Sequence, residues 1–171
     1  GIIGMGRIAE AVARRAKAFD MTILYHSRTR KQHLESELGV AFRDTINDIF
    51  KEADIISLHT SLTPETHHIV DKKALGLMKP SAILINTGRG QLIDERALVH
   101  ALKNGQIAGA GLDVYEEEPH LSPGLKNLEN ASLLPHIGSA TLETRDAMGF
   151  KVKENLDAFF KGQTVPNLVT E

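Results

Sequence analysis

Cysteine is absent from the 171-residue sequence, and the chain has neither a long apolar run nor a large excess of one charge. Without cysteine, the segment can form no disulfide, catalytic thiolate or cysteine–zinc site, and a cytoplasmic location is the simplest expectation. The formal net charge of −2 argues against a nucleic-acid partner and against a basic membrane-binding surface. No apolar run approaches a membrane span, so no membrane partner is expected.

Short apolar segments alternate with helix-like segments along the chain. The predicted strands are Met21–Tyr25, Val40–Phe42, Ile55–Leu58, Ala82–Ile85, Ile107–Leu112 and Ser132–Leu134. The predicted helices are Arg7–Phe19, Arg30–Leu38, Glu95–Asn104 and about Leu142–Lys161. This alternation predicts an α/β fold, a doubly wound parallel sheet of the Rossmann type, in one compact unit.

A glycine-rich turn stands at the start of the chain, between a strand end and a helix start. Residues 4–9 read GMGRIA and match the pattern G-x-G-x-x-G/A. Gly4 permits the tight turn, Gly6 lets backbone approach a pyrophosphate, and Ala9 allows close helix–strand packing. The turn predicts a dinucleotide-binding domain over residues 1–171, with phosphates at the helix N-terminus. The cofactor-binding residues predicted here are Gly4, Met5, Gly6, Arg7 and Ile8.

The end of the second predicted strand bears on which nicotinamide cofactor is bound. An acidic residue at this place would hold the ribose 2′-hydroxyl of NAD, but the sequence reads HSRTR over residues 26–30. Hydroxyl and guanidinium donors suit an anionic 2′-phosphate. We therefore predict NADP, with Ser27, Arg28 and Thr29 around the phosphate. The alternative is a solvated basic loop that tolerates either NADP or NAD.

Three later segments each follow a predicted strand: NTGRG at residues 86–90, DVYEEEP at 113–119 and PHIGS at 135–139. Ligands of open parallel sheets bind at the carboxyl ends of the strands. Together with the glycine turn, these segments resemble the D-isomer-specific 2-hydroxyacid dehydrogenase family, and within it most resemble the glyoxylate/hydroxypyruvate reductases. The resemblance covers essentially the whole chain, in motif order and in spacing.

The resemblance implies roles for individual residues. Arg89 would clamp the carboxylate and keto oxygen of a 2-ketoacid, which suits its planar fork of donors. His136 would be the general acid or base, because its ordinary pKa lies near working pH. Glu118 would hydrogen-bond His136 and favour its protonated form. Further cofactor contacts are implied for Thr87, Gly88, Asp113, Ile137 and Gly138.

The residues alone leave alternatives open at these positions. Arg89 can equally be a surface arginine in a glycine-bracketed turn, and His136 a structural histidine. Glu116 or Glu117 can stand in the place given to Glu118, which rests on the resemblance. No metal site is expected.

The resemblance implies NADP(H)-dependent reduction of glyoxylate or hydroxypyruvate, with a small 2-ketoacid as the partner and a homodimer for the full-length protein. Alternatives are an NAD-linked D-3-phosphoglycerate dehydrogenase-like enzyme and a non-catalytic, NAD(P)-sensing scaffold similar to the family's corepressors. Only three residues precede Gly4, whereas a strand needs roughly five. We therefore expect an N-terminally truncated segment that lacks the start of its first strand and the upstream substrate lobe.

Overall fold

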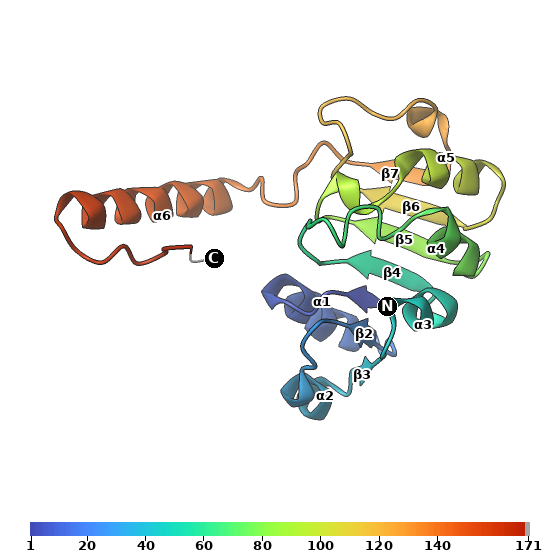
Figure 1. The fold of residues 1–171 in the computed structure, drawn as a ribbon, viewed down its shortest axis with the longest axis horizontal. Helices are drawn as coiled ribbons and strands as arrows, with labels where there is room; N and C mark the ends of the chain where they lie inside the picture. Colours follow the sequence, from blue (N-terminus) through green and yellow to red (C-terminus); the bar gives the residue numbers. More distant parts are fainter. Residues whose placement is uncertain (170–171) are drawn as a thin grey trace. The chain divides into compact units, whose positions relative to one another are not determined.

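The computed structural model describes residues 1–169, and the chain forms two compact units, Gly1–Pro135 and His136–Glu171. We call them the sheet unit and the helix unit. The sheet unit holds seven parallel strands in the order β3-β2-β1-β4-β5-β6-β7 (Figure 1). This arrangement confirms the predicted doubly wound α/β fold. That residues 1–171 make a single dinucleotide-binding domain stays a prediction.

The elements of the sheet unit follow one another in regular alternation. The strands are β1 (Ile2–Ile3), β2 (Leu24–His26), β3 (Ala41–Phe42), β4 (Ile55–Leu58), β5 (Ile83–Asn86), β6 (Gly109–Leu112) and β7 (Ala131–Leu133). The helices are α1 (Arg7–Lys17), α2 (Gln32–Leu38), α3 (Ile46–Glu52), α4 (Lys72–Leu77) and α5 (Glu95–Lys103), with the 3-10 turns η1 (Gly90–Leu92) and η2 (Leu125–Asn127).

Two of these helices, α3 and α4, were not among those predicted. They contain seven and six residues, too few for apolar residues to repeat at a clear helical spacing. Their starts are nevertheless marked by capping residues. The Thr45 hydroxyl accepts the N–H of Asp48, and the Asp71 carboxylate accepts the N–H of Ala74.

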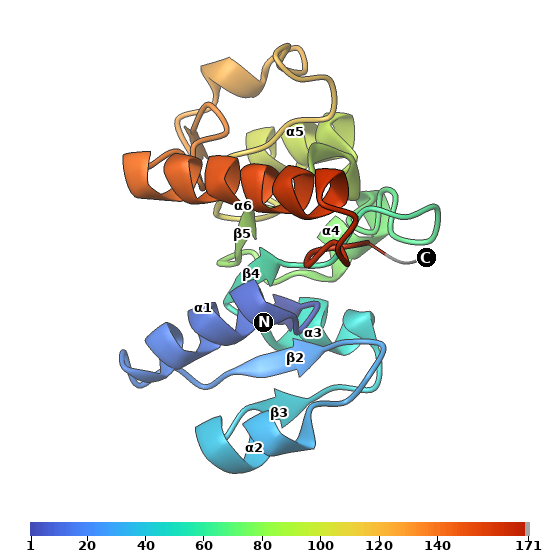
Figure 2. The same cartoon turned by 90° about the vertical axis from the view of Figure 1, so that its left-hand side faces the viewer.

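The strand order reverses next to β1, and the helices change face with it. From β1 the chain winds outward through α1 and α2 to β3, then crosses back through α3 to β4 on the other side of β1. Because crossovers between parallel strands are right-handed, the two directions of winding place their helices on opposite faces. Figure 2 shows α1 and α2 together with β2 and β3 at one end of the sheet.

Alternating strand residues supply a separate core on each face. Ile3 and Leu24 join the large cluster beneath α3, α4 and α5, whereas Ile2 and Tyr25 join the smaller cluster beneath α1 and α2. Successive side chains of a strand point to opposite faces, and in β1 and β2 the residues of both faces are buried. Along β4 and β5 every second residue is fully buried. The alternate residues, which point to the other face of the sheet, are partly exposed, and Ile83 among them is 39% exposed.

The helix unit consists mainly of α6 (Leu142–Phe160), which agrees with the predicted helix at Leu142–Lys161. Thr141 caps it by accepting the N–H of Thr144. Most of its side chains are exposed, and Lys153 pairs with Asp157 at 2.6 Å on its surface. Among the helices in the described part of the chain, none is both long enough and apolar enough for a membrane span.

We predict that Leu84→Ala strongly destabilises the sheet unit. Leu84 is completely buried in the large cluster at the centre of the sheet, so its truncation leaves a cavity. The expected loss in the free energy of unfolding is about 2–5 kcal/mol, measured by urea denaturation. Leu62→Ala, the same change at a loop leucine that is 38% exposed, is the control, and its expected cost is below about 1 kcal/mol. Equal costs at both positions would contradict the assigned core.

Candidate cofactor cleft and catalytic edge

A cleft of about 640 Å³ lies where the strand order reverses. Its walls come from the carboxyl ends of β1, β2 and β4, which is where open α/β sheets bind their ligands. Of the predicted cofactor residues, six line it: Gly4, Met5, Gly6, Ser27, Arg28 and Thr29.

The glycine turn fits the bound phosphates that its pattern predicts. Gly4 has a φ of +88°, and a Cβ there would lie 2.8 Å from the carbonyl group of His59 and the nitrogen of Thr60. Apart from Gly6 and its two chain neighbours, no described residue has an atom within 4 Å of a Cβ built on Gly6, so this side of the turn has room for a ligand. Glycine as N-cap also leaves the first turn of α1 without a side-chain cap. Both features suit an anion at the helix N-terminus.

Arg7 and Ile8, also predicted to contact the cofactor, form the first turn of α1 and are exposed. They are not among the residues that line the cleft. That the backbone N–H groups of Arg7 and Ile8 bind the cofactor phosphates therefore stays a prediction.

Hydrogen bonds of the Tyr25 side chain hold the basic segment after β2 in place. The buried Tyr25 hydroxyl donates to Glu35 at 2.7 Å and accepts the N–H of Lys31 at 2.7 Å. Arg30 pairs with the same Glu35 carboxylate at 2.7 Å, and these hydrogen bonds lower the pKa of Glu35 to about 2. Arg30 is thus held outside the cleft, whereas Arg28 and Lys31 line it.

The segment after β4 supplies a wall of the cleft that the sequence motifs did not reveal. Its lining residues are His59, Thr60, Ser61, Thr63, Glu65, Thr66 and Ile69. The Ser57 hydroxyl lies 2.9 Å from His59 Nε2, and burial lowers the pKa of His59 below its usual value. Thr66 braces the loop by accepting the N–H of Thr63 at 2.8 Å. The only sequence signal for these residues is that they follow a predicted strand. They line the cleft because β4 lies next to β1, and this adjacency cannot be read from the sequence.

A second group of predicted residues lies at the carboxyl end of β5. The fully buried Asn86 donates through Nδ2 to the carbonyl of Arg89 at 2.8 Å and accepts the N–H of Gly88 at 3.0 Å. This amide therefore shapes the turn from Thr87 to Arg89 from within. Arg89 itself is exposed, and its Nη1 donates to the carbonyl of Gly88 at 2.7 Å. The guanidinium is presented to solvent at the sheet edge.

The segment that follows β6 lies beside this turn and contains Asp113 and Glu118. Asp113 is 3% exposed, and its N–H donates to the carbonyl of Asn86 at 3.0 Å. The Glu118 carboxylate accepts the N–H of Tyr115 at 3.0 Å. A Cβ on Gly90 would lie 1.8 Å from the Tyr115 carbonyl carbon, so the two segments pack backbone to backbone. The structure thus brings Arg89, Asp113 and Glu118 to neighbouring strand ends, outside the residues that line the cleft. We call this place the catalytic edge after the roles predicted for its residues.

The remaining predicted residues, His136, Ile137 and Gly138, belong to the helix unit. His136 has a φ of 55°, a left-handed conformation that is uncommon outside glycine and frequent at functional sites. The carbonyl of Ile137 accepts the N–H of Ala140 at 3.0 Å. The pairing of His136 with Glu118 stays a prediction.

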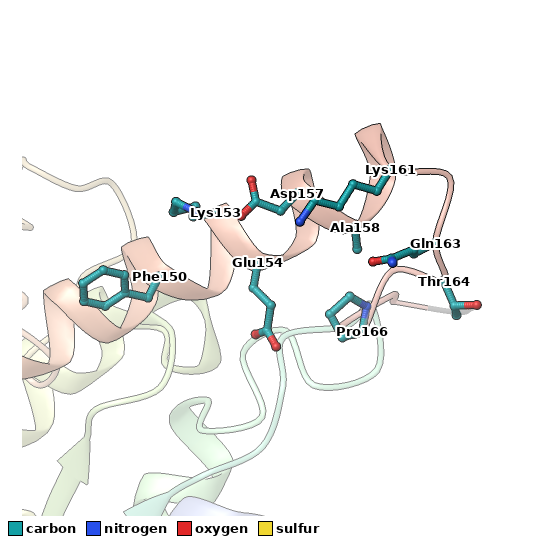
Figure 3. A pocket seen from close by; sticks show the side chains of 9 residues that line it. All are labelled: Phe150, Lys153, Glu154, Asp157, Ala158, Lys161, Gln163, Thr164 and Pro166. Carbon is teal, nitrogen blue, oxygen red and sulfur yellow. Dashed lines mark hydrogen bonds and ion pairs between the residues drawn. The ribbon is translucent and has the colours of Figure 1, made fainter.

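The helix unit also contains a groove of about 530 Å³ between α6 and the segment that follows it. Figure 3 shows the side chains that line this groove, among them Phe150, Glu154 and Pro166. None of the predicted site residues lines it. Among the described residues, no group of three or more histidine and acidic side chains could hold a metal ion.

A doubly wound sheet with a glycine turn in the cleft at its point of reversal defines a nucleotide-binding α/β domain. The chain belongs to the D-isomer specific 2-hydroxyacid dehydrogenase family, because the model of that family's NAD binding domain matches residues 1–138. The family match supports a nicotinamide cofactor for the cleft. This match confirms the family resemblance inferred from the sequence motifs.

Among related sequences, the chain is 55% identical over its full length to glyoxylate reductase of Thermococcus litoralis and 52% identical to that of Pyrococcus furiosus. It spans 51% of the length of each of these proteins.

Solved structures agree with this family. The NADPH-dependent glyoxylate/hydroxypyruvate reductase of Sinorhizobium meliloti, in complex with NADP and malonate, is 43% identical, with a TM-score of 0.88 over 94% of this chain and 49% of that one. D-mandelate dehydrogenase of Rhodotorula graminis in its holo form is 30% identical, with a TM-score of 0.94 over all of this chain and 50% of that one.

We predict that alanine at Gly4 lowers stability, whereas alanine at Gly6 weakens cofactor binding. Gly4→Ala should lower the free energy of unfolding by about 1–3 kcal/mol, because the new side chain meets backbone at a positive φ. Gly6→Ala should leave stability within about 0.5 kcal/mol, because φ is −92° and the space is open, yet should weaken cofactor binding. Thermal unfolding and cofactor fluorescence titration measure the two effects. A destabilised Gly6→Ala variant with intact binding would contradict this assignment.

Proposed function

We propose that the protein containing this chain uses NADPH to reduce a small 2-ketoacid, glyoxylate or hydroxypyruvate, to glycolate or the D-2-hydroxyacid. One observation carries the proposal. Arg89 and Glu118 follow two neighbouring strands, at the same carboxyl-terminal side of the sheet as the cleft, and the cleft wall after β2 is basic. The names of the relatives support the ketoacid, and the NADP complex of one relative supports the cofactor.

In this proposal the cofactor is held along the carboxyl ends of the strands. The turn from Gly4 to Gly6 and the start of α1 hold the pyrophosphate through backbone N–H groups. Ser27, Arg28 and Thr29 surround the 2′-phosphate, for which their donors are suited. Asp113 would lie near the nicotinamide carboxamide, and Thr87, Gly88, Ile137 and Gly138 would make further contacts with the cofactor. When bound, NADPH supplies the hydride.

The chain's own residues bind the substrate and move the proton. Arg89 holds the ketoacid carboxylate and polarises the keto oxygen through its guanidinium. His136 in its protonated form donates a proton to that oxygen as charge develops there, and in the reverse direction it removes the proton. Glu118 stabilises the imidazolium of His136. A homodimeric full-length protein and a cytoplasmic location stay predictions.

We predict that His136→Gln in the full-length protein lowers kcat for glyoxylate reduction by about 10²- to 10⁴-fold, because the proton donor is lost. NADPH affinity should change little. NADPH oxidation followed by absorbance, together with fluorescence titration, measures both quantities. His100→Gln, at an exposed position on α5, is the control.

Three outcomes would contradict the proposal. Turnover with phosphoglycerate and NAD would favour the D-3-phosphoglycerate dehydrogenase alternative. NADPH binding without turnover of any small 2-ketoacid would favour the cofactor-sensing scaffold. An unchanged kcat in the His136 variant would remove His136 from the mechanism.

We predict that Arg28→Ala weakens NADPH binding by about ten- to a hundredfold, because one charge-assisted hydrogen bond to the 2′-phosphate is worth about 1.5–3 kcal/mol. NADH has no such phosphate, so its affinity should stay close to that of the unsubstituted protein. Titrations with both cofactors measure the effect. Arg96→Ala, an exposed arginine of α5 outside the cleft, controls for the loss of a positive charge. Equal losses for NADPH and NADH would overturn the phosphate assignment.

A further inference from the structure

Glu116 is one of three consecutive glutamates after β6, and its environment differs from that of its neighbours. Glu117 and Glu118 are exposed, whereas Glu116 is partly buried and hydrogen-bonded on both carboxylate oxygens. Its partners come from α5 and from the segment after β4. Glu116 therefore joins parts of the chain that are far apart in the sequence.

The first connection is a reciprocal pair with Glu95, the first residue of α5. The Glu116 carboxylate accepts the N–H of Glu95 at 3.0 Å, and the Glu95 carboxylate accepts the N–H of Glu116 at 2.9 Å. Each side chain thus satisfies the other's backbone donor, as in a capping box made between distant segments.

This pair is not what stability alone would favour. Glu95 is only 2% exposed, and its second oxygen finds no hydrogen-bond donor among the described residues. A buried and partly unsatisfied carboxylate costs free energy of folding. Such costs are found where a geometry serves function.

The second connection runs to His68, whose Nε2 lies 2.5 Å from Glu116 Oε1. The His68 N–H donates to the carbonyl of Gln91, and the Gln91 side chain donates to the carbonyl of Glu116, both at 2.8 Å. His68 lies between Thr66 and Ile69, which line the cofactor cleft. Glu116 therefore links the cleft wall to the catalytic edge.

The segments that meet at Glu116 are the ones that carry the proposed substrate-binding groups. Arg89 directly precedes Gly90, which packs on the Tyr115–Glu116 peptide, and the Glu118 carboxylate accepts the N–H of Tyr115. Displacement of Glu116 would therefore move the Arg89 turn and the Glu118 loop relative to each other.

We propose that Glu116 is a positioning residue for the reduction, which sets Arg89 and Glu118 against the wall of the cofactor cleft without itself contacting substrate. This inference rests on the proposed function. Misplacement of reacting groups by about 1 Å can cost about a hundredfold in rate, so the fixed geometry has a measurable value.

The kinetic test compares Glu116→Ala, Glu116→Gln and the control Glu117→Ala in the full-length protein. Glu116→Ala should lower kcat/KM for the ketoacid by about ten- to a hundredfold, with NADPH affinity nearly unchanged. Glu116→Gln should recover most of the rate, because its amide fills the same space and keeps an acceptor for the N–H of Glu95. Glu117→Ala should behave like the unsubstituted protein, because this side chain is exposed.

Several results would overturn the inference. They are unchanged kinetics in Glu116→Ala, a Glu116→Gln variant as impaired as Glu116→Ala, or parallel losses of NADPH affinity, melting temperature and turnover. The last pattern is what a purely structural role predicts.

Hydrogen exchange separates this inference from the proposed function. In Glu116→Ala the amides of Glu95, Tyr115 and His68 should exchange faster than in the unsubstituted protein, with or without turnover. Absence of ketoacid reduction in the unsubstituted protein would overturn the proposed function, while the exchange rates still decide whether Glu116 fixes these segments. Unchanged exchange would overturn the role given to Glu116.

Discussion

Gly4 lies against the backbone of His59 and Thr60 with no room for a side chain between them, and the rest of the site depends on this contact. The contact joins the turn after β1 to the segment after β4, and these are the two strands from which the chain winds in opposite directions. Because helices leave β1 and β4 on opposite faces, the carboxyl ends of these strands stay open to a ligand. The cleft is thus a consequence of topology and of one glycine.

Buried and partly buried polar groups determine how the loops of the cleft and the catalytic edge lie on an apolar sheet. Asn86 shapes the Arg89 turn, Glu95 and Glu116 cap each other, and Tyr25 anchors the basic segment below Arg28. Each of these groups is hydrogen-bonded to backbone, which offsets part of the cost of removing it from water. Apolar packing beneath the helices holds the strands, while these polar contacts determine where the loops at their ends lie.

Much of the fold could be predicted from the sequence because its signals are local. The strand Ile55–Leu58 was predicted with its observed bounds, and the predicted helix Glu95–Asn104 differs from α5 (Glu95–Lys103) by one residue at its end. The helices α3 and α4 escaped prediction because six or seven residues show no clear period. The cleft wall after β4 escaped because nothing local marks β4 as the neighbour of β1.

The sequence by itself determined the α/β class, the glycine turn and the order of motifs that indicates the family, since each rests on residues close together in the chain. Tertiary structure alone decided that Arg28 lines the cleft while Arg30 turns to Glu35, and that Glu116, rather than Glu117, is tied to Glu95 and His68. Glu116 and Glu117 are neighbours of the same type, but the partners of Glu116 lie 21 and 48 residues away in the sequence. Sheet pairing brings those partners together, and no local pattern encodes that pairing.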